Sequence, residues 1–137
     1  MNMATDKPQR QIKFRAWHGK SKRMLMLGFN WGYESECLPV NGNWDDIVRV
    51  EDLIFLQFTG LTDKNGKGIW EGDIFSMFQG SQRSAIFWDE EFGAWAVTAQ
   101  QSGASQIQDD LLSNLLDTGY VIGNIYENPD LLGKVQP

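Results

Sequence analysis

Residues 53–78 read LIFLQFTGLTDKNGKGIWEGDIFSMF, and this stretch decides the fold class. Leu53 to Phe58 and Ile74 to Phe78 are short apolar runs rich in Phe, Ile and Leu, which is typical of strands. Between them Asp63 to Lys67 is a turn, in which the Asn65-Gly66 pair suits the positive φ angles of a tight hairpin. The stretch therefore predicts short strands joined by turns.

Further strands are predicted on both sides of this stretch. Residues 12–17 alternate, with Ile12, Phe14 and Ala16 on one face, and this pattern predicts a half-buried strand. Residues 18–22 form a turn, from which residues 24–27 return as the second strand of a hairpin. Three more strands are predicted at residues 84–88, 94–99 and 120–126.

Residues 28–50 leave two alternatives open. Gly28, Gly32, Pro39 and Gly42 break any long element, and Asn41-Gly42 is a turn signal. The segment therefore forms either short strands or an irregular excursion.

The hydrophobic period changes after residue 104, which predicts a helix from Ser105 to Gly119. Ser105 and Gln108 have the spacing of a capping box, and Gly119 suits the position that ends a helix. An apolar stripe with helical spacing lies between them, made of Ile107, Leu111 and Leu115 and widened by Leu112 and Leu116. Asn128-Pro129-Asp130 suits the start of a short terminal turn.

The order of these elements predicts a mostly β fold with a minor helix. A small antiparallel barrel closed at one end by the C-terminal helix fits this order, since closure removes exposed sheet edges. We expect a single domain at residues 12–132, with a flexible N-terminus at 1–11 and a short tail at 133–137.

Composition agrees with one globular domain. The chain has 137 residues, of which 42% are hydrophobic and 22% charged, a balance that a disordered chain would not show. Cys37 is the single cysteine, so an internal disulfide is excluded. The sequence has neither a signal peptide nor an apolar run long enough to cross a bilayer, and we therefore expect a cytoplasmic protein without membrane contact.

Charge is unevenly distributed along the chain. Residues 1–23 hold seven cations and one anion, whereas the rest holds five cations and seventeen anions. The favoured interpretation is that the basic first strand lies against the acidic body and is neutralised there. Contact between the basic part of one copy and the acidic part of another ranks second, and nucleic-acid binding third, because the acidic remainder repels phosphates.

Four segments resemble the YopX family of phage and prophage proteins. They are Ile-Lys-Phe-Arg-Ala-Trp at 12–17 followed by Met24, the run from Gln57 to Ile74, Trp88-Asp89-Glu90 with Gly93, and Gly-Asn-Ile-Tyr-Glu-Asn-Pro-Asp-Leu-Leu at 123–132. The chain departs from the family pattern at His18, Phe58, Gly68 and Trp70. The resemblance implies an SH3-like β-barrel in a protein of a phage or prophage, active in the bacterial host cell, with no cofactor and no catalytic residue.

Several residues of the second segment are turn builders. Gly60, Gly66 and Gly72 can adopt positive φ, and Asp63 and Asp73 can accept backbone N–H bonds in turns. Asn65 also belongs to this group. We therefore interpret these residues as structural.

No pattern of catalytic or metal-binding residues is present. His18 is the single histidine and is expected in an exposed turn among lysines, without a nucleophile-elbow motif to meet it. Neither CxxC nor HxxxH spacing occurs, and the adjacent acids, such as Asp89-Glu90-Glu91, are interpreted as solvated surface. We therefore expect a protein that is not an enzyme and binds no metal.

The aromatic residues of the segment at 28–50 leave two alternatives open. Trp31, Tyr33 and Trp44 lie in the segment of uncertain structure, where they either seal the barrel mouth or form an exposed surface for a protein partner or a second copy. The leading hypothesis is a non-enzymatic phage accessory protein that binds a host or phage protein or itself. The alternative is a nucleic-acid-binding barrel that uses Lys13, Arg15, Lys20, Lys22 and Arg23.

Overall fold

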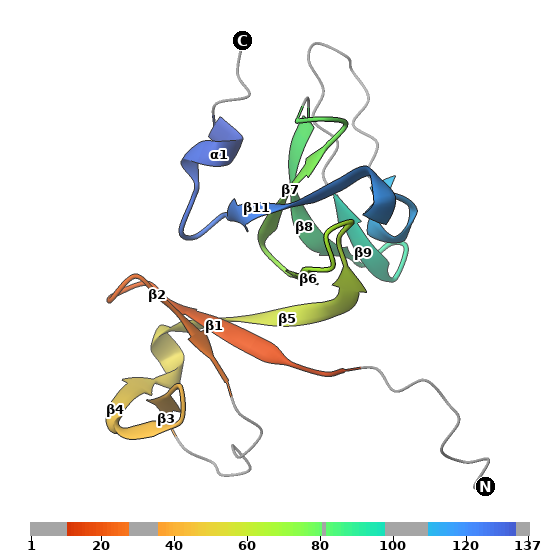
Figure 1. Cartoon of the computed structure of the whole chain (residues 1–137). Helices are drawn as coiled ribbons and strands as arrows, with labels where there is room; N and C mark the ends of the chain where they lie inside the picture. Colours follow the sequence, from red (N-terminus) through yellow and green to blue (C-terminus); the bar gives the residue numbers. More distant parts are fainter. Residues whose placement is uncertain (1–10, 28–35, 81, 98–109, 134–137) are drawn as a thin grey trace, which may run out of the picture.

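The chain folds into three antiparallel sheets with a curled, half-barrel arrangement (Figure 1). The computed structural model describes residues 11–27, 36–80, 82–97 and 110–133. The mostly β fold with a minor helix is confirmed, and the curled antiparallel sheets are consistent with the SH3-like expectation. None of the helices in these ranges is long and apolar enough to span a membrane.

The first sheet has the strand order β2-β1-β5-β6. Its strands are β1 (Phe14–His18), β2 (Arg23–Met26), β5 (Leu53–Thr62) and β6 (Gly68–Trp70). In one row across the sheet, Ala16 lies opposite both Leu25 and Phe55. The predicted hairpin at residues 12–27 is therefore confirmed, and its first strand also pairs with the stretch that begins at Leu53.

The second sheet has the order β10-β9-β8-β7-β11 and carries the larger core. Its strands are β7 (Asp73–Met77), β8 (Gln82–Asp89), β9 (Ala94–Val97), β10 (Asp110–Leu111) and β11 (Gly119–Asn124). The buried cluster consists of Ile69, Phe75, Met77, Ile86, Trp95, Val97, Leu112 and Val121. Since Ile69 comes from β6, this core reaches across to the first sheet.

A separate hairpin forms the third sheet, from β3 (Cys37–Val40) and β4 (Asn43–Arg49). Its turn residues Asn41 and Gly42 have φ of 50° and 81°, as a tight two-residue hairpin requires. The structure therefore selects short strands for residues 37–49, while residues 28–35 lie outside the described part of the chain. A short 3-10 helix (η2, Val50–Asp52) leads from the hairpin into β5.

β5 joins the two halves of the molecule. Its ten residues pair first with β1 and then with β6, and the register shifts between Phe58 and Thr62 (Figure 1). Gly60 lies at this shift with φ of 83°, a value that favours glycine. Thr59 stabilises this irregular part of β5. Its hydroxyl donates a hydrogen bond to the Ile69 carbonyl at 2.6 Å and accepts one from the Leu61 amide at 3.1 Å.

The helix predicted for residues 105–119 is wrong in the part that the structure describes. Residues 105–109 lie outside that part, and the next elements are β10 and two 3-10 segments, η3 (Leu112–Asn114) and η4 (Leu116–Thr118). Gly119 does not end a helix but begins β11 opposite Met77, where a Cβ would collide with the Ser76 carbonyl oxygen. Leu112, Leu115 and Leu116 of the stripe pack in or against the core cluster from short turns, so tertiary contacts override the helical period. The α-helix that is present, α1 (Asp130–Gly133), follows Asn128-Pro129.

β1 is covered on both of its faces, which corrects two expectations. Ala16 is fully buried on one face and Arg15 is 9% exposed on the other, so the strand is not half-buried. His18 belongs to β1 and is buried, with its Nδ1 hydrogen-bonded to the Ser21 hydroxyl, rather than lying in an exposed turn. The alternation within β1 could not reveal that other elements cover both sides.

Candidate interaction surface

The outer face of the β3–β4 hairpin exposes apolar side chains. Trp44 is 73% exposed and Ile47 is 54% exposed. In the pairing with β3, Asn43 lies opposite Val40, and Ile47 lies opposite the adjacent residue Pro39. Residues 44–46 lie between these two pairs and therefore form a bulge in β4. A bulge redirects side chains and interrupts pairing. We define Trp44, Asp45 and Ile47 as the hairpin surface.

The inner face of the same hairpin is firmly held. Val40 and Val48 pack with Leu25 of β2 in a second buried cluster, against which Leu53 also packs. At the turn, the Met26 amide donates to the Asn41 side-chain oxygen at 3.0 Å. The apolar outer face is therefore presented on a supported element.

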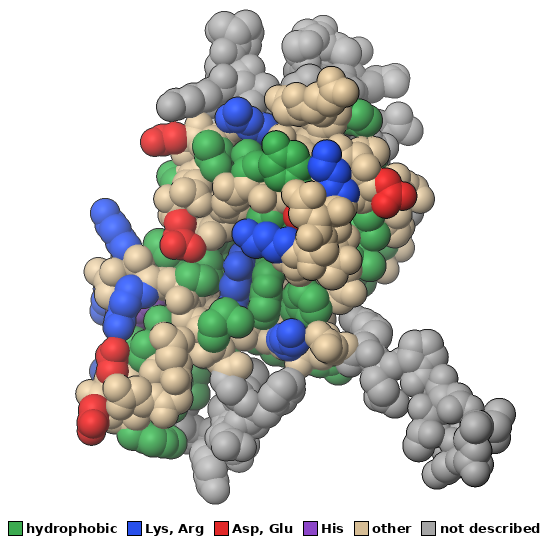
Figure 2. Space-filling view, in the orientation of Figure 1, with side chains coloured by type: hydrophobic (Ala, Val, Ile, Leu, Met, Phe, Trp, Pro, Cys, Tyr) green, Lys and Arg blue, Asp and Glu red, His purple; other side chains and the backbone are tan. Residues whose placement is uncertain are grey.

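Asp46 ties the bulge to β2. Its Oδ2 lies 2.8 Å from Arg23 Nη1, and this hydrogen bond raises the pKa of the Arg23 guanidinium. Asp45 next to it is exposed, and its amide donates to the Asn43 side chain at 3.0 Å. Figure 2 shows hydrophobic and acidic side chains close together at the outer end of this hairpin. The surface thus combines an exposed indole with negative charge.

Of the three aromatic residues predicted for partner binding, the structure places one. Trp44 lies on the hairpin surface, fully consistent with the exposed alternative and not with sealing of a barrel mouth. Trp31 and Tyr33 lie outside the described residues, so their role stays a prediction. Ile47 was missed by the sequence reasoning, although the buried Val48 beside it could have indicated an outward position for its neighbour.

The five cations predicted for nucleic-acid binding are not gathered into one free patch. Arg15 is the clearest correction, because it is buried and pairs with Asp73. Arg23 pairs with Asp46, and Lys20 Nζ lies 3.2 Å from Asp52 Oδ1.

The two remaining cations are exposed. Lys13 Nζ lies 4.9 Å from the centre of the Phe58 ring, and Lys22 lies in the turn after β1 with φ of 54°. For Arg15, Lys20 and Arg23 the favoured interpretation, neutralisation against the acidic body, agrees with the ion pairs.

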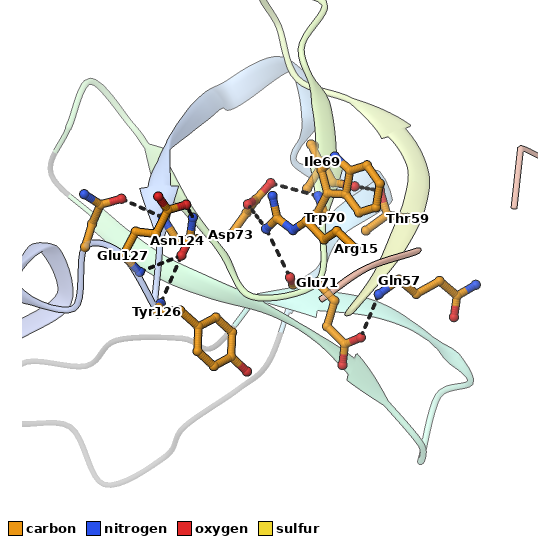
Figure 3. A network of polar contacts seen from close by, with 11 residues as sticks. Arg15, Gln57, Thr59, Ile69, Trp70, Glu71, Asp73, Asn124, Tyr126 and Glu127 are labelled. Atoms are coloured by element: carbon orange, nitrogen blue, oxygen red, sulfur yellow. Dashed lines mark hydrogen bonds and ion pairs between the residues drawn. The ribbon is translucent and has the colours of Figure 1, made fainter. Parts of the chain in front are cut away.

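Arg15 and Asp73 form the centre of a buried polar network (Figure 3). Arg15 Nη2 lies 2.6 Å from Asp73 Oδ1, and Asp73 Oδ2 accepts from the Trp70 amide at 2.8 Å. The guanidinium also lies 5.1 Å from the centre of the Trp70 ring. Burial raises the pKa of the Asp73 carboxyl, although the nearby Arg15 charge and the hydrogen bonds act to lower it.

The end of β11 lies beside this network. The Asn124 side-chain oxygen accepts from the Tyr126 and Glu127 amides at 3.0 and 2.8 Å, which holds the turn (Figure 3). The Tyr126 ring stacks on Trp17 of β1, with ring centres 5.7 Å apart. Burial, and secondly the Glu71 charge, raise the pKa of Tyr126. Three of the four segments that carry the resemblance therefore meet at one internal joint.

The predicted turn builders are found in structural roles. Gly60, Gly66 and Gly72 have φ of 83°, 83° and 85°. Asp63 Oδ1 accepts from the Asn65 and Lys67 amides, both at 2.9 Å. The predicted turn at residues 63–67 is confirmed, and Gly66 has the expected positive φ, whereas Asn65 is not among the described residues with positive φ. The carboxylate of Asp63 shapes this loop.

Two further exposed aromatic residues lie near the end of β8 and in the turn that follows it. Trp88 is 45% exposed and Phe92 is 63% exposed. We define Trp88, Glu90, Glu91 and Phe92 as the β8–β9 tip. The sequence reasoning treated its acids as solvated surface and missed Phe92, an aromatic residue between two acids and a glycine. Elsewhere too, in the residues with described positions, no three His, Cys, Asp or Glu side chains are grouped to hold a metal ion.

Comparisons with known proteins agree with this architecture. A family model described as "YopX protein" matches residues 13–133. Among solved structures, protein EF1440 from Enterococcus faecalis is 28% identical, with a TM-score of 0.53 over 90% of this chain and 99% of that one. No curated protein matches.

Proposed function

The chain belongs to the YopX protein family, and we propose that it is a non-enzymatic phage or prophage accessory protein that binds a protein partner in the bacterial cytoplasm. The contact surface is the hairpin surface of Trp44, Asp45 and Ile47. The partner is a host or phage protein, and a second copy of the chain is the alternative occupant.

The exposure of Trp44 carries this proposal. An indole that is 73% exposed leaves most of its apolar area in water, and transferring apolar area out of water is favourable. Tryptophan is among the residue types that most often dominate the energy of protein interfaces. Because the other face of the hairpin is packed, little ordering of the backbone would be needed on binding.

Charge favours a protein over a nucleic acid at this surface. Asp45 lies beside Trp44, and acidic side chains repel phosphates. Stacking of bases on an aromatic ring works best with cations in between, whereas Arg23, the cation that contacts the bulge, is paired with Asp46. Nucleic-acid binding through Lys13 and Lys22 remains the alternative, and the experiment separates the two.

The test is a capture experiment from bacterial lysate with tagged protein, performed with and without nuclease and read by mass spectrometry. Trp44→Ser is compared with the matched variant Ile12→Ser, since Ile12 is also an exposed apolar residue at 53%. We expect a specific protein that survives nuclease, is retained by Ile12→Ser and is lost with Trp44→Ser.

Two results would contradict the proposal. Capture that disappears after nuclease treatment would move the function to the exposed cations. Equal capture by wild type and Trp44→Ser would remove the hairpin surface from the interaction. Sedimentation of the purified protein at several concentrations identifies the self-association alternative, which Trp44→Ser should then also abolish.

A further inference from the structure

The β8–β9 tip lies in the other half of the molecule from the β3–β4 hairpin (Figure 1). Its two aromatic side chains, Trp88 and Phe92, are both substantially exposed. In the sequence, Trp88 precedes and Phe92 follows the exposed acids Glu90 and Glu91. The tip is therefore a second surface of mixed aromatic and acidic character, separate in structure from the hairpin surface.

The Trp88 side chain of the tip is held in place by a contact with the core. Trp88 lies opposite Trp95 in the β8–β9 ladder, with ring centres 5.1 Å apart at an angle of 74°, an edge-to-face contact. Trp95 is itself part of the main buried cluster. One ring of the tip is thus fixed to the core while its other side remains in solvent, so binding there would restrict few rotamers.

The turn backbone is fixed independently of the exposed acids. Asp89 is buried, and its Oδ1 accepts from the Glu91 amide at 2.9 Å and from the Phe92 amide at 3.3 Å. Glu90 and Glu91 take part in none of the ion pairs found in the described ranges. Their charge is therefore not used to build the turn and is directed to solvent.

From this combination we propose that the β8–β9 tip is a docking site for a basic segment of a protein partner. A Lys or Arg side chain would lie over the face of Trp88 or Phe92, and neighbouring cations would pair with Glu90 and Glu91. Charge complementarity selects this occupant: an acidic segment or a nucleic acid would be repelled. The basic first hairpin of a second copy fits less well, since Lys20 and Arg23 already pair within their own chain.

The β8–β9 tip would thus be a second site, separate from the hairpin surface and selective for basic segments. Two sites in separate halves would let one chain engage a partner at two points, or bridge two partners. The two sites are tested independently, because the variants at the tip leave Trp44 unchanged.

The test uses a defined probe, a fluorescein-labelled peptide of six Gly-Arg repeats, with a Gly-Glu peptide of the same length as negative control. Binding to the full chain is followed by fluorescence anisotropy at low salt, and contacts are mapped by NMR on the tryptophan indole N–H signals. Glu90→Lys/Glu91→Lys and Phe92→Ser remove the two components of the site. The control Asp117→Lys/Asp130→Lys makes the same change in net charge at two exposed acids outside both proposed surfaces.

We expect the Trp88 indole signal to shift on addition of the Gly-Arg peptide. Affinity should fall about tenfold in Glu90→Lys/Glu91→Lys and a few-fold in Phe92→Ser, from the loss of surface ion pairs and of a cation–π contact. The control variant should lose about twofold or less, the effect of net charge alone. A control that weakens binding as much as the tip variants would overturn the proposal, as would an unshifted Trp88 signal or no binding to wild type.

Discussion

Replacing Arg15 by methionine tests whether the buried ion pair holds the two halves of the molecule together. The change keeps an apolar stem of similar length but removes the cation that lies 2.6 Å from Asp73 Oδ1. Both side chains are almost fully buried, at 11% and 4% exposure, so the Asp73 charge would lose its partner in a place with little water. Breaking a buried pair by removing one partner costs about 3–5 kcal/mol. Since a domain of this size is stable by roughly 5–15 kcal/mol, the loss should be large and measurable.

The stability loss should depend on pH with a defined sign. Burial already raises the pKa of Asp73, and Arg15 opposes that shift, so removing Arg15 raises the pKa further. A carboxyl whose pKa is higher in the folded than in the unfolded protein binds its proton more tightly when folded. Stability therefore increases as pH falls through the folded pKa, and is lost as pH rises. The difference in the free energy of unfolding between Arg15→Met and wild type should therefore be smaller at pH 5 than at pH 7.

Urea unfolding followed by tryptophan fluorescence at both pH values measures these differences. Adding Asp73→Asn to Arg15→Met should recover part of the loss at pH 7, because the amide oxygen can still accept from the Trp70 amide without a charge. Arg49→Met is the matched control: its ion pair with Glu51 is solvent-exposed, and surface pairs contribute about 0–1 kcal/mol. A loss below about 1 kcal/mol for Arg15→Met, or a difference that does not decrease in acid, would refute the reasoning.

Three further substitutions test other features. Gly119→Ala should destabilise by about 1–3 kcal/mol, because its Cβ meets the Ser76 carbonyl oxygen, and thermal unfolding measures the loss; an unchanged midpoint would contradict this close approach. Phe78→Asn/Gln79→Gly should stabilise by about 1–2 kcal/mol, since both residues have left-handed φ, 53° and 59°, which Asn and Gly adopt more easily; urea unfolding checks the sign, and destabilisation would count against it. Trp44→Ser should change stability by less than about 0.5 kcal/mol in the same assay, and a larger loss would mean that the exposed indole packs on the protein.

The sequence predicted those parts of the fold that depend on local chemistry. The strands that begin near Leu53 and Ile74, and the turn at Asn41-Gly42, follow from apolar runs and from residues that adopt positive φ. The turn roles of Gly60 and Asp63 followed in the same way.

Features that depend on distant contacts were not predictable in this way. Arg15 has the pattern of an exposed cation within its strand, and its burial depends on the ion pair with Asp73, which is 58 residues away in the sequence. Leu112 belongs to the stripe with helical spacing, yet it lies in a 3-10 segment, where it is fully buried in the main core cluster. For the candidate site, the sequence indicated Trp44 as a candidate for partner binding but predicted neither its bulge nor the exposure of Ile47, because both depend on the pairing with β3.

The carboxylates of Asp63 and Asp73 restrict how the edges of the two larger sheets can pair with another molecule. β6 and β11 lie at the edges of their sheets, and the free amides of an edge strand can recruit a strand from another molecule. Here Asp73 accepts a hydrogen bond from the Trp70 amide of β6, and Asp63 accepts one from the Val121 amide of β11 at 2.9 Å. Acidic side chains occupy the positions that an incoming backbone would need. Each carboxylate thereby closes one amide of its edge to an incoming strand, which disfavours strand exchange and amyloid-like stacking there.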